Sequence, residues 1–336
     1  MHGATRARMG GVGPMSVPLV IAIPSKGRLK DQVESWLADC GLSLSFASGE
    51  RGYLASIESL EDIQIRLASA ADIATALMAG DIHLGITGED LLREFGDGVG
   101  QKALLLMPLG FGRADLVVAA PRSWLDVETM SDLDDVARLY LARTGARLRV
   151  ATKYRSQTRA FFAHHAIADY RIVDSAGATE GAPAAGVSEL VVDITSSGAT
   201  LLANGLKPLS DGLILRSQAQ LAGSLVAQWI PSQTACARAL IRILEARAKG
   251  QSHAFMAWPS VQEQAARQAI APFASPDGEA EAGGALVPIS DLFAAVAALT
   301  GAAIGPVKVG RHTYVFEASS AASNRLEAAI ASRASP

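Results

Sequence analysis

Short apolar runs alternate with amphipathic segments along most of the chain. Val17–Ile23 is an apolar run that ends at Pro24 and predicts a buried strand, and Leu29–Cys40 follows with apolar residues at helical spacing. Further strands are predicted at Ile63–Leu67, His83–Thr87, Leu116–Ala120, Arg147–Ala151, Tyr170–Asp174 and Leu190–Ile194, and further helices at Ala71–Ala79, Glu89–Phe95, Ser131–Leu141, Ser156–His165 and Thr200–Asn204. Gly80 is placed to cap the helix before it. Strands that alternate with helices predict an α/β fold with parallel sheets and right-handed crossovers.

The pattern changes after Ile230 and Pro231. Thr234–Ala248 predicts a long helix, and residues 274–285 form a break rich in Pro, Gly, Ala and Glu. Strand and helix signals recur at His253–Trp258, Val261–Ile270, Ala285–Ile289, Asp291–Thr300, Pro306–Val309, Tyr314–Glu317 and Asn324–Ala331. This second alternation predicts a separate small α+β domain.

We therefore interpret the chain as two α/β lobes followed by that domain. Lobe II is inserted between two segments of lobe I. The predicted parts are a tail at 1–16, lobe I at 17–112 and 207–230, lobe II at 113–206, and a C-terminal extension at 231–336. Met9 or Met15 could be the true start, with the preceding residues a disordered tail.

Composition narrows the class of protein. Hydrophobic residues make up 49% and charged residues 19%, which suits buried α/β layers and argues against general disorder. The net charge of -3 provides no basic field for nucleic acid. Cys40 and Cys236 form neither a disulfide framework nor a metal-ligand spacing. Because no secretory signal and no membrane-spanning apolar run is found, the chain is expected to be cytoplasmic, without a membrane partner.

The segment Glu189–Thr200 has the pattern of a phosphate-binding joint. A buried strand delivers Asp193 at its carboxyl end, and small residues then lead into a helix. Small residues let backbone N–H groups converge on one phosphate, and Gly198 permits a positive φ. The helix start adds a dipole that favours an anion. An ordinary strand–turn–helix joint capped by Ser and Thr is the alternative.

Other polar residues extend this candidate site. Glu180 lies upstream in a loop of small residues, and two carboxylates in one cleft suit a ribose diol. Lys26 and Arg28 follow the first strand, and Arg51 lies in a Gly-bearing stretch; cations are what a departing pyrophosphate requires. Gly88 ends a strand and opens a helix, where N–H groups could hold an anion. Taken singly, each of these cations is more often a solvated surface charge, Glu180 could be a solvated loop acid, and Gly88 could be a turn residue.

In this order the segments resemble ATP phosphoribosyltransferase, the enzyme family that opens histidine biosynthesis. The matching segments are Ile21–Leu29, Arg51–Tyr53, Asp72–Glu94, Leu109–Ala120, Val150–Arg155 and Gly177–Leu206, of which the last is the most specific. The resemblance covers roughly residues 17–230. It implies a core like type II periplasmic binding proteins, with two α/β lobes and a substrate cleft between them.

The resemblance also implies a reaction and its residues. The family transfers the 5-phosphoribosyl group of phosphoribosyl pyrophosphate to N1 of ATP, with Mg²⁺, and releases pyrophosphate. Glu180 and Asp193 match the acids that bind the ribose hydroxyls, and Lys26, Arg28 and Arg51 match cations near the pyrophosphate and the nucleotide. The loop for the 5-phosphate is matched by Thr195, Ser196, Ser197, Gly198, Ala199 and Thr200.

The chain departs from the family in several places. Ser69 replaces an arginine that often precedes the Asp72 motif, with Arg66 out of register, and Ala74 replaces a proline. Ser196 replaces an acid found in some members.

The family has a short form that works with a histidyl-tRNA-synthetase-like subunit and a long form whose C-terminal domain binds histidine and forms hexamers. Residues 231–336 have the length of the long form's extension without the sequence pattern expected of it. A homo-oligomer, a regulatory subunit and inhibition by histidine are therefore hypotheses.

Three other functions are compatible with parts of the pattern. A two-lobed solute-binding protein would share the fold, but an export signal is missing. A nucleotide-salvage phosphoribosyltransferase would carry two adjacent acids in its loop, whereas Ile194 follows Asp193. An inactive regulatory paralogue is disfavoured by the presence of Glu180, Asp193 and Gly198.

Overall fold

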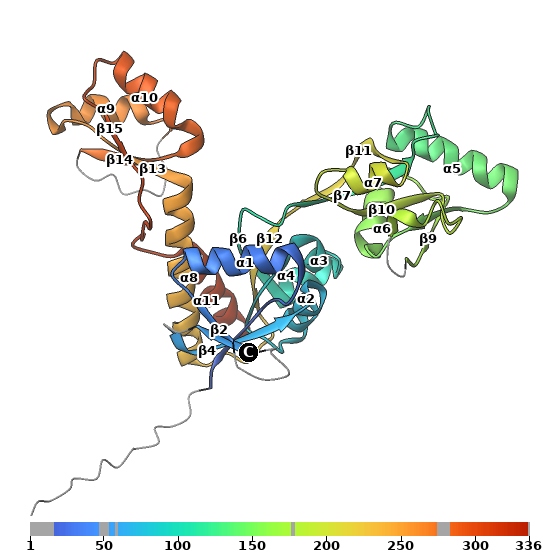
Figure 1. Ribbon diagram of the computed structural model, residues 1–336, viewed down its shortest axis with the longest axis horizontal. Helices are drawn as coiled ribbons and strands as arrows, with labels where there is room; N and C mark the ends of the chain where they lie inside the picture. The colour runs from blue at the N-terminus through green and yellow to red at the C-terminus, as the bar shows by residue number, and fades with distance from the viewer. Residues whose placement is uncertain (1–16, 47–53, 58–59, 176–178, 274–282, 335–336) are drawn as a thin grey trace, which may run out of the picture.

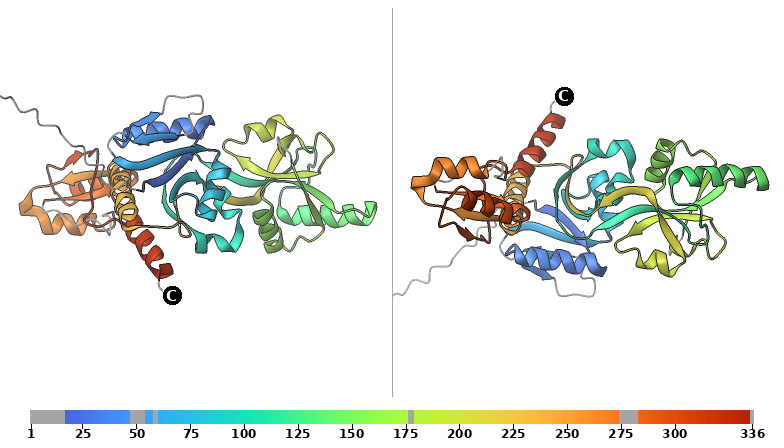
Figure 2. Two further views of the ribbon diagram at one scale, coloured as in Figure 1. Left: turned by 90° about the horizontal axis from the view of Figure 1, so that it is seen from below. Right: turned by 90° about the horizontal axis from the view of Figure 1, so that it is seen from above.

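The structure is a computed structural model that describes residues 17–46, 54–57, 60–175, 179–273 and 283–334. Lobe I lies between lobe II and a small C-terminal domain in all three views (Figures 1 and 2). Among the described residues, no helix has the length and apolar character needed to cross a membrane.

Lobe I is built around a sheet of seven described strands. Its strands are β1 (Leu19–Pro24), β2 (Leu44–Phe46), β3 (Leu54–Ile57), β4 (Leu60–Ala68), β5 (Leu84–Gly88), β6 (Ala103–Pro108) and β12 (Ala219–Ser224), in the order β2-β3-β4-β1-β5-β12-β6. Its helices are α1 (Gly27–Asp39), α2 (Ala70–Ala79), α3 (Glu89–Arg93) and α4 (Val99–Lys102), with a 3-10 turn at Gly96–Gly98.

Strand β1 shows why the sheet has two covered faces. It pairs in parallel with β4 and β5 and is buried along its whole length. Leu19, Ile21 and Ile23 pack with α1, while Val20 and Ala22 pack with α2 on the other face. The alternation follows from the two-residue period of a strand, so both faces must be apolar.

Lobe II has a second sheet of five described strands. They are β7 (Ala114–Pro121), β8 (Leu148–Ala151), β9 (Tyr170–Val173), β10 (Leu190–Thr195) and β11 (Leu206–Ser217), in the order β11-β7-β10-β8-β9. Helices α5 (Met130–Thr144) and α6 (Arg155–His164) pack on one face, and the short helix α7 (Ala199–Ala203) packs on the other.

The chain crosses between the lobes twice, and the second crossing differs from the sequence prediction. Residues 207–230 were expected in lobe I, but β11 pairs with β7 in the lobe II sheet. Only from Gln218 onward, with β12, does the chain return to lobe I. Both sheets are also mixed rather than parallel. In lobe I, for example, only two residues separate β3 from β4, too few for the crossover that a parallel pair needs, so these two strands pair antiparallel.

The C-terminal extension is divided between two structural units. Its elements are α8 (Pro231–Ser252), β13 (His253–Ala257), α9 (Glu263–Ile270), β14 (Gly284–Pro288), α10 (Leu292–Gly301), β15 (Lys308–Gly310) and α11 (Ala321–Ala334), with 3-10 turns at Ser260–Gln262 and Ile289–Asp291. The sheet β14-β13-β15 packs with α9 and α10 around a core of its own. In contrast, α8 and α11 complete the core of lobe I through residues such as Leu240 and Leu326. The separate α+β domain therefore spans about residues 253–310 rather than 231–336.

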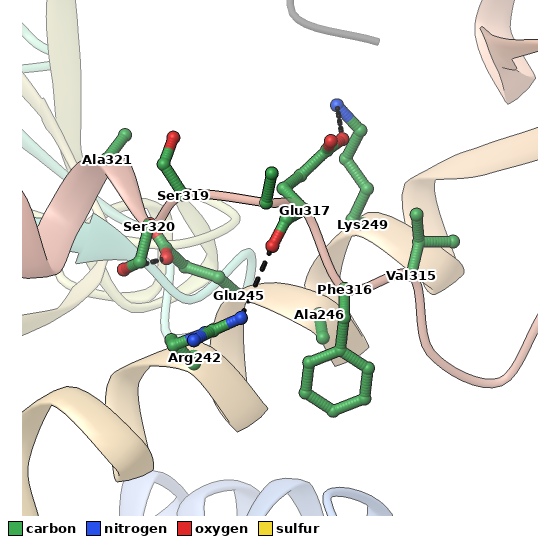
Figure 3. Close-up of a pocket in the computed structure, with 11 residues that line it drawn as sticks. Arg242, Glu245, Ala246, Lys249, Val315, Phe316, Glu317, Ser319, Ser320 and Ala321 are labelled. Carbon is green, nitrogen blue, oxygen red and sulfur yellow. Dashed lines mark hydrogen bonds and ion pairs between the residues drawn. The ribbon is translucent and has the colours of Figure 1, made fainter. Parts of the chain in front are cut away.

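Residues 311–320 return from this domain along α8, and we call them the strap. Tyr314–Glu317, which carried a strand or helix signal, is irregular here. Val315 N donates to Ala246 O at 2.9 Å, and Glu245 accepts from Ala322 N at 2.9 Å at the start of α11. Arg242 and the Lys249–Glu317 ion pair line a pocket between the strap and α8 (Figure 3). A Cβ on Gly250 would lie 2.6 Å from His312 O, so the strap approaches the helix where only glycine fits.

One buried histidine predicts a pH-dependent stability. His83 Nδ1 accepts from Val20 N and its Nε2 lies 3.1 Å from Gln228 O, so the neutral ring with Nε2–H fits both partners. Burial lowers the pKa of His83 below 6.5. The unfolded chain then binds more protons than the folded chain, so stability is lost as the pH falls below about 6.5, by at most about 1.4 kcal/mol per pH unit.

The measurement is urea unfolding of the wild type and of His83→Asn between about pH 7.5 and pH 5.5. The pKa of His253 is also lowered by burial, so the difference between the two proteins is the informative quantity. We expect a smaller pH dependence in His83→Asn. An equal dependence in both proteins would remove His83 as its source.

Candidate active site

The end of β10 presents an acid and a loop with open backbone donors. Leu190–Val192 is fully buried, Asp193 is half-buried, and the following loop is largely exposed. Gly198 has φ +76 with open space around it, and its N–H donates to Thr195 Oγ1 at 2.8 Å. Within the described part of the chain, the N–H groups of Ser196, Ser197 and Thr200 have no protein acceptor. Exposed N–H groups of this kind can bind an anion.

The helix after this loop is as short as the sequence predicted. The predicted segment was Thr200–Asn204, and α7 spans Ala199–Ala203, with Gly205 at φ +69 just after its C-cap. A helix of little more than one turn has a small dipole. Anion binding here would therefore depend on individual N–H groups and nearby cations.

The two predicted acids lie in each other's electrostatic field. Burial raises the pKa of Asp193, and the negative charge of Glu180 raises it further. Asp193 also hydrogen-bonds with Thr179, the neighbour of Glu180 in the 3-10 turn Thr179–Gly181, and its Oδ1 accepts from Ile194 N at 2.8 Å. The structure thus brings Glu180 and Asp193 together at the edge of lobe II. Among the described residues, no group of three or more His, Cys, Asp or Glu side chains could hold a metal ion.

Lys153 is a site residue that the sequence reasoning did not single out. Its charge lowers the pKa of Asp193, and its Nζ lies 5.2 Å from the ring centroid of Tyr154. Lys153 follows β8, which pairs in parallel with β10. The carboxyl ends of neighbouring parallel strands meet at one sheet edge. The position of Lys153 just after a predicted strand was therefore the sequence feature that could have indicated it as a site residue.

The predicted cations fall in different places. Arg28, in the first turn of α1, donates from Nη2 to Ser196 Oγ at 3.1 Å, and Ser196 Oγ donates to Arg113 O at 3.0 Å. Lobe I and the lobe II loop therefore meet at Ser196. Lys26 is exposed at the N-cap of α1. Arg51 lies outside the described residues.

Gly88 has a structural position rather than an open anion site. The N–H of Glu89 donates to Gln218 O, and the N–H of Asp90 donates to Ser217 Oγ. The Asp90 carboxylate lies where a Cβ on Gly88 would be. The two donors after Gly88 are thus occupied, and glycine is needed here because Asp90 folds back over the backbone.

Asp90 belongs to a buried network that joins the lobes. Tyr154 of lobe II donates its hydroxyl to Asp90 Oδ2 at 2.5 Å, and Ser217 Oγ donates to Oδ1 at 2.7 Å. Burial and the Asp90 charge raise the pKa of Tyr154, so it stays a donor. Glu94 of lobe I accepts from Ser156 N at 2.8 Å at the start of α6. These contacts fix how the two halves of the site face each other.

Most of the chain is similar to known proteins. Residues 69–245 match the sequence model of the family described as HisG: ATP phosphoribosyltransferase. The ATP phosphoribosyltransferase of Caulobacter vibrioides (strain NA1000 / CB15N) is 58% identical over 319 residues, which cover 95% of this chain and 100% of that protein. That of Bradyrhizobium sp. (strain ORS 278) is 53% identical over 71% of this chain and 74% of its own length. A chain of the ATP phosphoribosyl transferase (HisG:HisZ) complex from Thermotoga maritima is 26% identical over 61% of this chain and 87% of that chain, with a TM-score of 0.47.

Proposed function

Because the chain belongs to the ATP phosphoribosyltransferase family, we propose that its lobe II binds phosphoribosyl pyrophosphate through Glu180, Asp193 and the loop Thr195–Thr200. The enzyme transfers the 5-phosphoribosyl group to N1 of ATP, releases pyrophosphate, and performs the first step of histidine biosynthesis. The observation that carries the binding proposal is the pairing of two acids with a loop of unpaired N–H donors at one sheet edge.

The residues suit the charges that develop in this reaction. Displacement at the anomeric carbon builds positive charge on the sugar and negative charge on the leaving pyrophosphate. Glu180 and Asp193 would accept the ribose hydroxyl protons and hold the ring in line with the attacking nitrogen. Lys26 and Arg28, with Arg51 as a third candidate, would stabilise the pyrophosphate. N1 of adenine is a neutral nucleophile, so the reaction demands no strong general base.

Enzymes of this family need a metal ion, and we propose that it is Mg²⁺. Mg²⁺ is usually held by one or two carboxylates together with substrate phosphates and water. The adjacent carboxylates of Glu180 and Asp193 fit that donor set, and substrate oxygens would complete it. When bound, the ion would neutralise charge on the pyrophosphate.

The assay is purified protein with ATP, phosphoribosyl pyrophosphate and Mg²⁺, followed by the near-ultraviolet absorbance of the ribosylated adenine. Reactions without phosphoribosyl pyrophosphate, or with the metal chelated, are the controls. Product formation by the chain alone would also show that no partner subunit is required. Absence of product even with a cognate regulatory subunit would favour the inactive-paralogue alternative.

For regulation, we propose that the domain at residues 253–310 mediates inhibition by histidine and assembly into a homo-oligomer. Removing residues 231–336 is an unsuitable test, because α8 and α11 belong to the core of lobe I. Residues 250 and 312 lie side by side, so a short Gly/Ser linker can replace 253–310. We expect this variant to keep catalysis and lose both inhibition by histidine and the wild-type oligomer size. Rates with added histidine and light scattering measure the two effects, and inhibition that survives the excision would contradict the regulatory part.

A further inference from the structure

The register of the lobe II sheet places an arginine beside the phosphate loop. Arg216 of β11 lies opposite Asp115 of β7, and Asp115 lies opposite Thr195 of β10. Residues directly opposite one another point to the same face of a sheet, and so do residues two apart along a strand. Arg216, Asp115 and Thr195 therefore share the face that carries Asp193. The Cα atoms of Arg216 and Asp193 are about 12 Å apart, from about 4.8 Å between strands and about 3.4 Å per residue.

A cavity of about 440 Å³ lies along this row at the crossing between the lobes. Arg113 and Arg216 line it together with Asp115 and with Thr195 and Ser196 of the loop. Ser196 also accepts from Arg28 and donates to Arg113 O. The cavity is thus continuous with the site proposed for phosphoribosyl pyrophosphate.

The two arginines that line this cavity are accessible to a ligand. Both arginine side chains are exposed, and neither forms an ion pair with any residue that the structure describes. Asp115 is the single acid in the lining and is likewise without an ion pair there. The lining therefore carries a net positive charge, with the Arg28 guanidinium beside it. Guanidinium groups bind phosphate oxygens through pairs of parallel hydrogen bonds.

We propose that Arg113 and Arg216 bind the triphosphate of ATP. The inference rests on the proposed function, in which lobe II must hold two polyanions without mixing them. The loop N–H groups serve the 5-phosphate, and Lys26 and Arg28 approach from lobe I toward the pyrophosphate. Arg113 and Arg216 line the cavity at Thr195 and Ser196, and the register displaces Arg216 across the sheet from Asp193. ATP with its adenine near Asp193 would direct its phosphates to this pair, which makes the two arginines specificity residues for a triphosphate.

The test is steady-state kinetics of Arg113→Ala, Arg216→Ala and the double variant, with each substrate varied at saturation of the other. Each single change should raise the KM for ATP about tenfold, as expected for one lost charge-assisted hydrogen bond, and leave the KM for phosphoribosyl pyrophosphate within about twofold. Asp115→Asn should lower the KM for ATP, because it removes the negative charge from the lining. Calorimetric binding of ATP, ADP and AMP should show that the double variant loses its preference for the triphosphate.

Arg122→Ala is the matched control, since Arg122 is equally exposed and lies just beyond the opposite end of β7. It should leave both KM values unchanged, and thermal unfolding of every variant should match the wild type. A rise in the KM for phosphoribosyl pyrophosphate alone, or no change in either KM, would overturn the proposal. A wild type that forms no ribosylated adenine would instead refute the proposed function, so the two failures are distinct.

Discussion

Replacing Asp193 by asparagine should lower the turnover number about a hundredfold, the effect typical of losing one positioned polar group. The amide has nearly the shape of the carboxylate, and its oxygen can still accept from Ile194 N, so β10 should keep its structure. The variant loses the negative charge and replaces one acceptor by a donor, which cannot accept a ribose hydroxyl proton. The turnover number with both substrates saturating is the measurement.

The pH profile separates this role from a structural one. Burial and Glu180 raise the pKa of Asp193 above its ordinary value of 3.8. The carboxylate must be ionised to accept the hydroxyls. As the pH is lowered, the wild-type rate should therefore begin to fall while the pH is still above 3.8, and Asp193→Asn should lack that acid limb. A raised pKa also means that the ionised carboxylate of Asp193 destabilises the fold at neutral pH. The unfolding temperature of Asp193→Asn should therefore be no lower than that of the wild type. Near wild-type turnover would remove Asp193 from the site.

Local features of the fold could be predicted from the sequence because they depend on short segments. The apolar run at Leu190–Ile194 predicted β10, and burial on both faces of a strand requires such a run. Gly80 caps α2 with φ +85, as a glycine at a helix end predicts. The sequence pattern and the family resemblance predicted that Glu180 and Asp193 share a cleft, and in the structure the charge of Glu180 raises the pKa of Asp193.

The features that escaped prediction are set by contacts between distant segments. The spacing of hydrophobic residues does not identify the strand with which a segment pairs. For that reason residues 207–217, which form most of β11, were assigned to lobe I although they pair with β7 of lobe II. The apolar face of α8 predicted a helix but not its packing partner, which is lobe I. No motif in the sequence distinguishes Lys153, Arg113 or Arg216 from other charged residues. Only the neighbouring strand ends place Lys153 near Asp193, and only the fold of lobe II places the two arginines beside Thr195 and Ser196.

Replacing Arg28 by alanine should lower the turnover number by about a hundredfold to a thousandfold. Arg28 is the lobe I cation that the structure places against the lobe II loop, through its hydrogen bond to Ser196 Oγ. If it stabilises the departing pyrophosphate, its charge acts most strongly in the transition state, so the turnover number should fall more than the affinity for either substrate changes. Single-turnover rates of product formation measure the chemical step directly.

Ser196→Ala distinguishes this role from a contact that merely joins the lobes. That change removes the same hydrogen bond, and also the bond from Ser196 to Arg113 O, but leaves the guanidinium in place. We expect a loss of about threefold or less, because both groups are exposed and water can replace the lost partner at little net cost. Arg28→Lys should recover part of the rate, since lysine keeps the charge without the paired donors. Equal losses in Arg28→Ala and Ser196→Ala would show that Arg28 acts through the contact between lobes, and the cation for the leaving group would then have to be sought at Lys26 or Arg51.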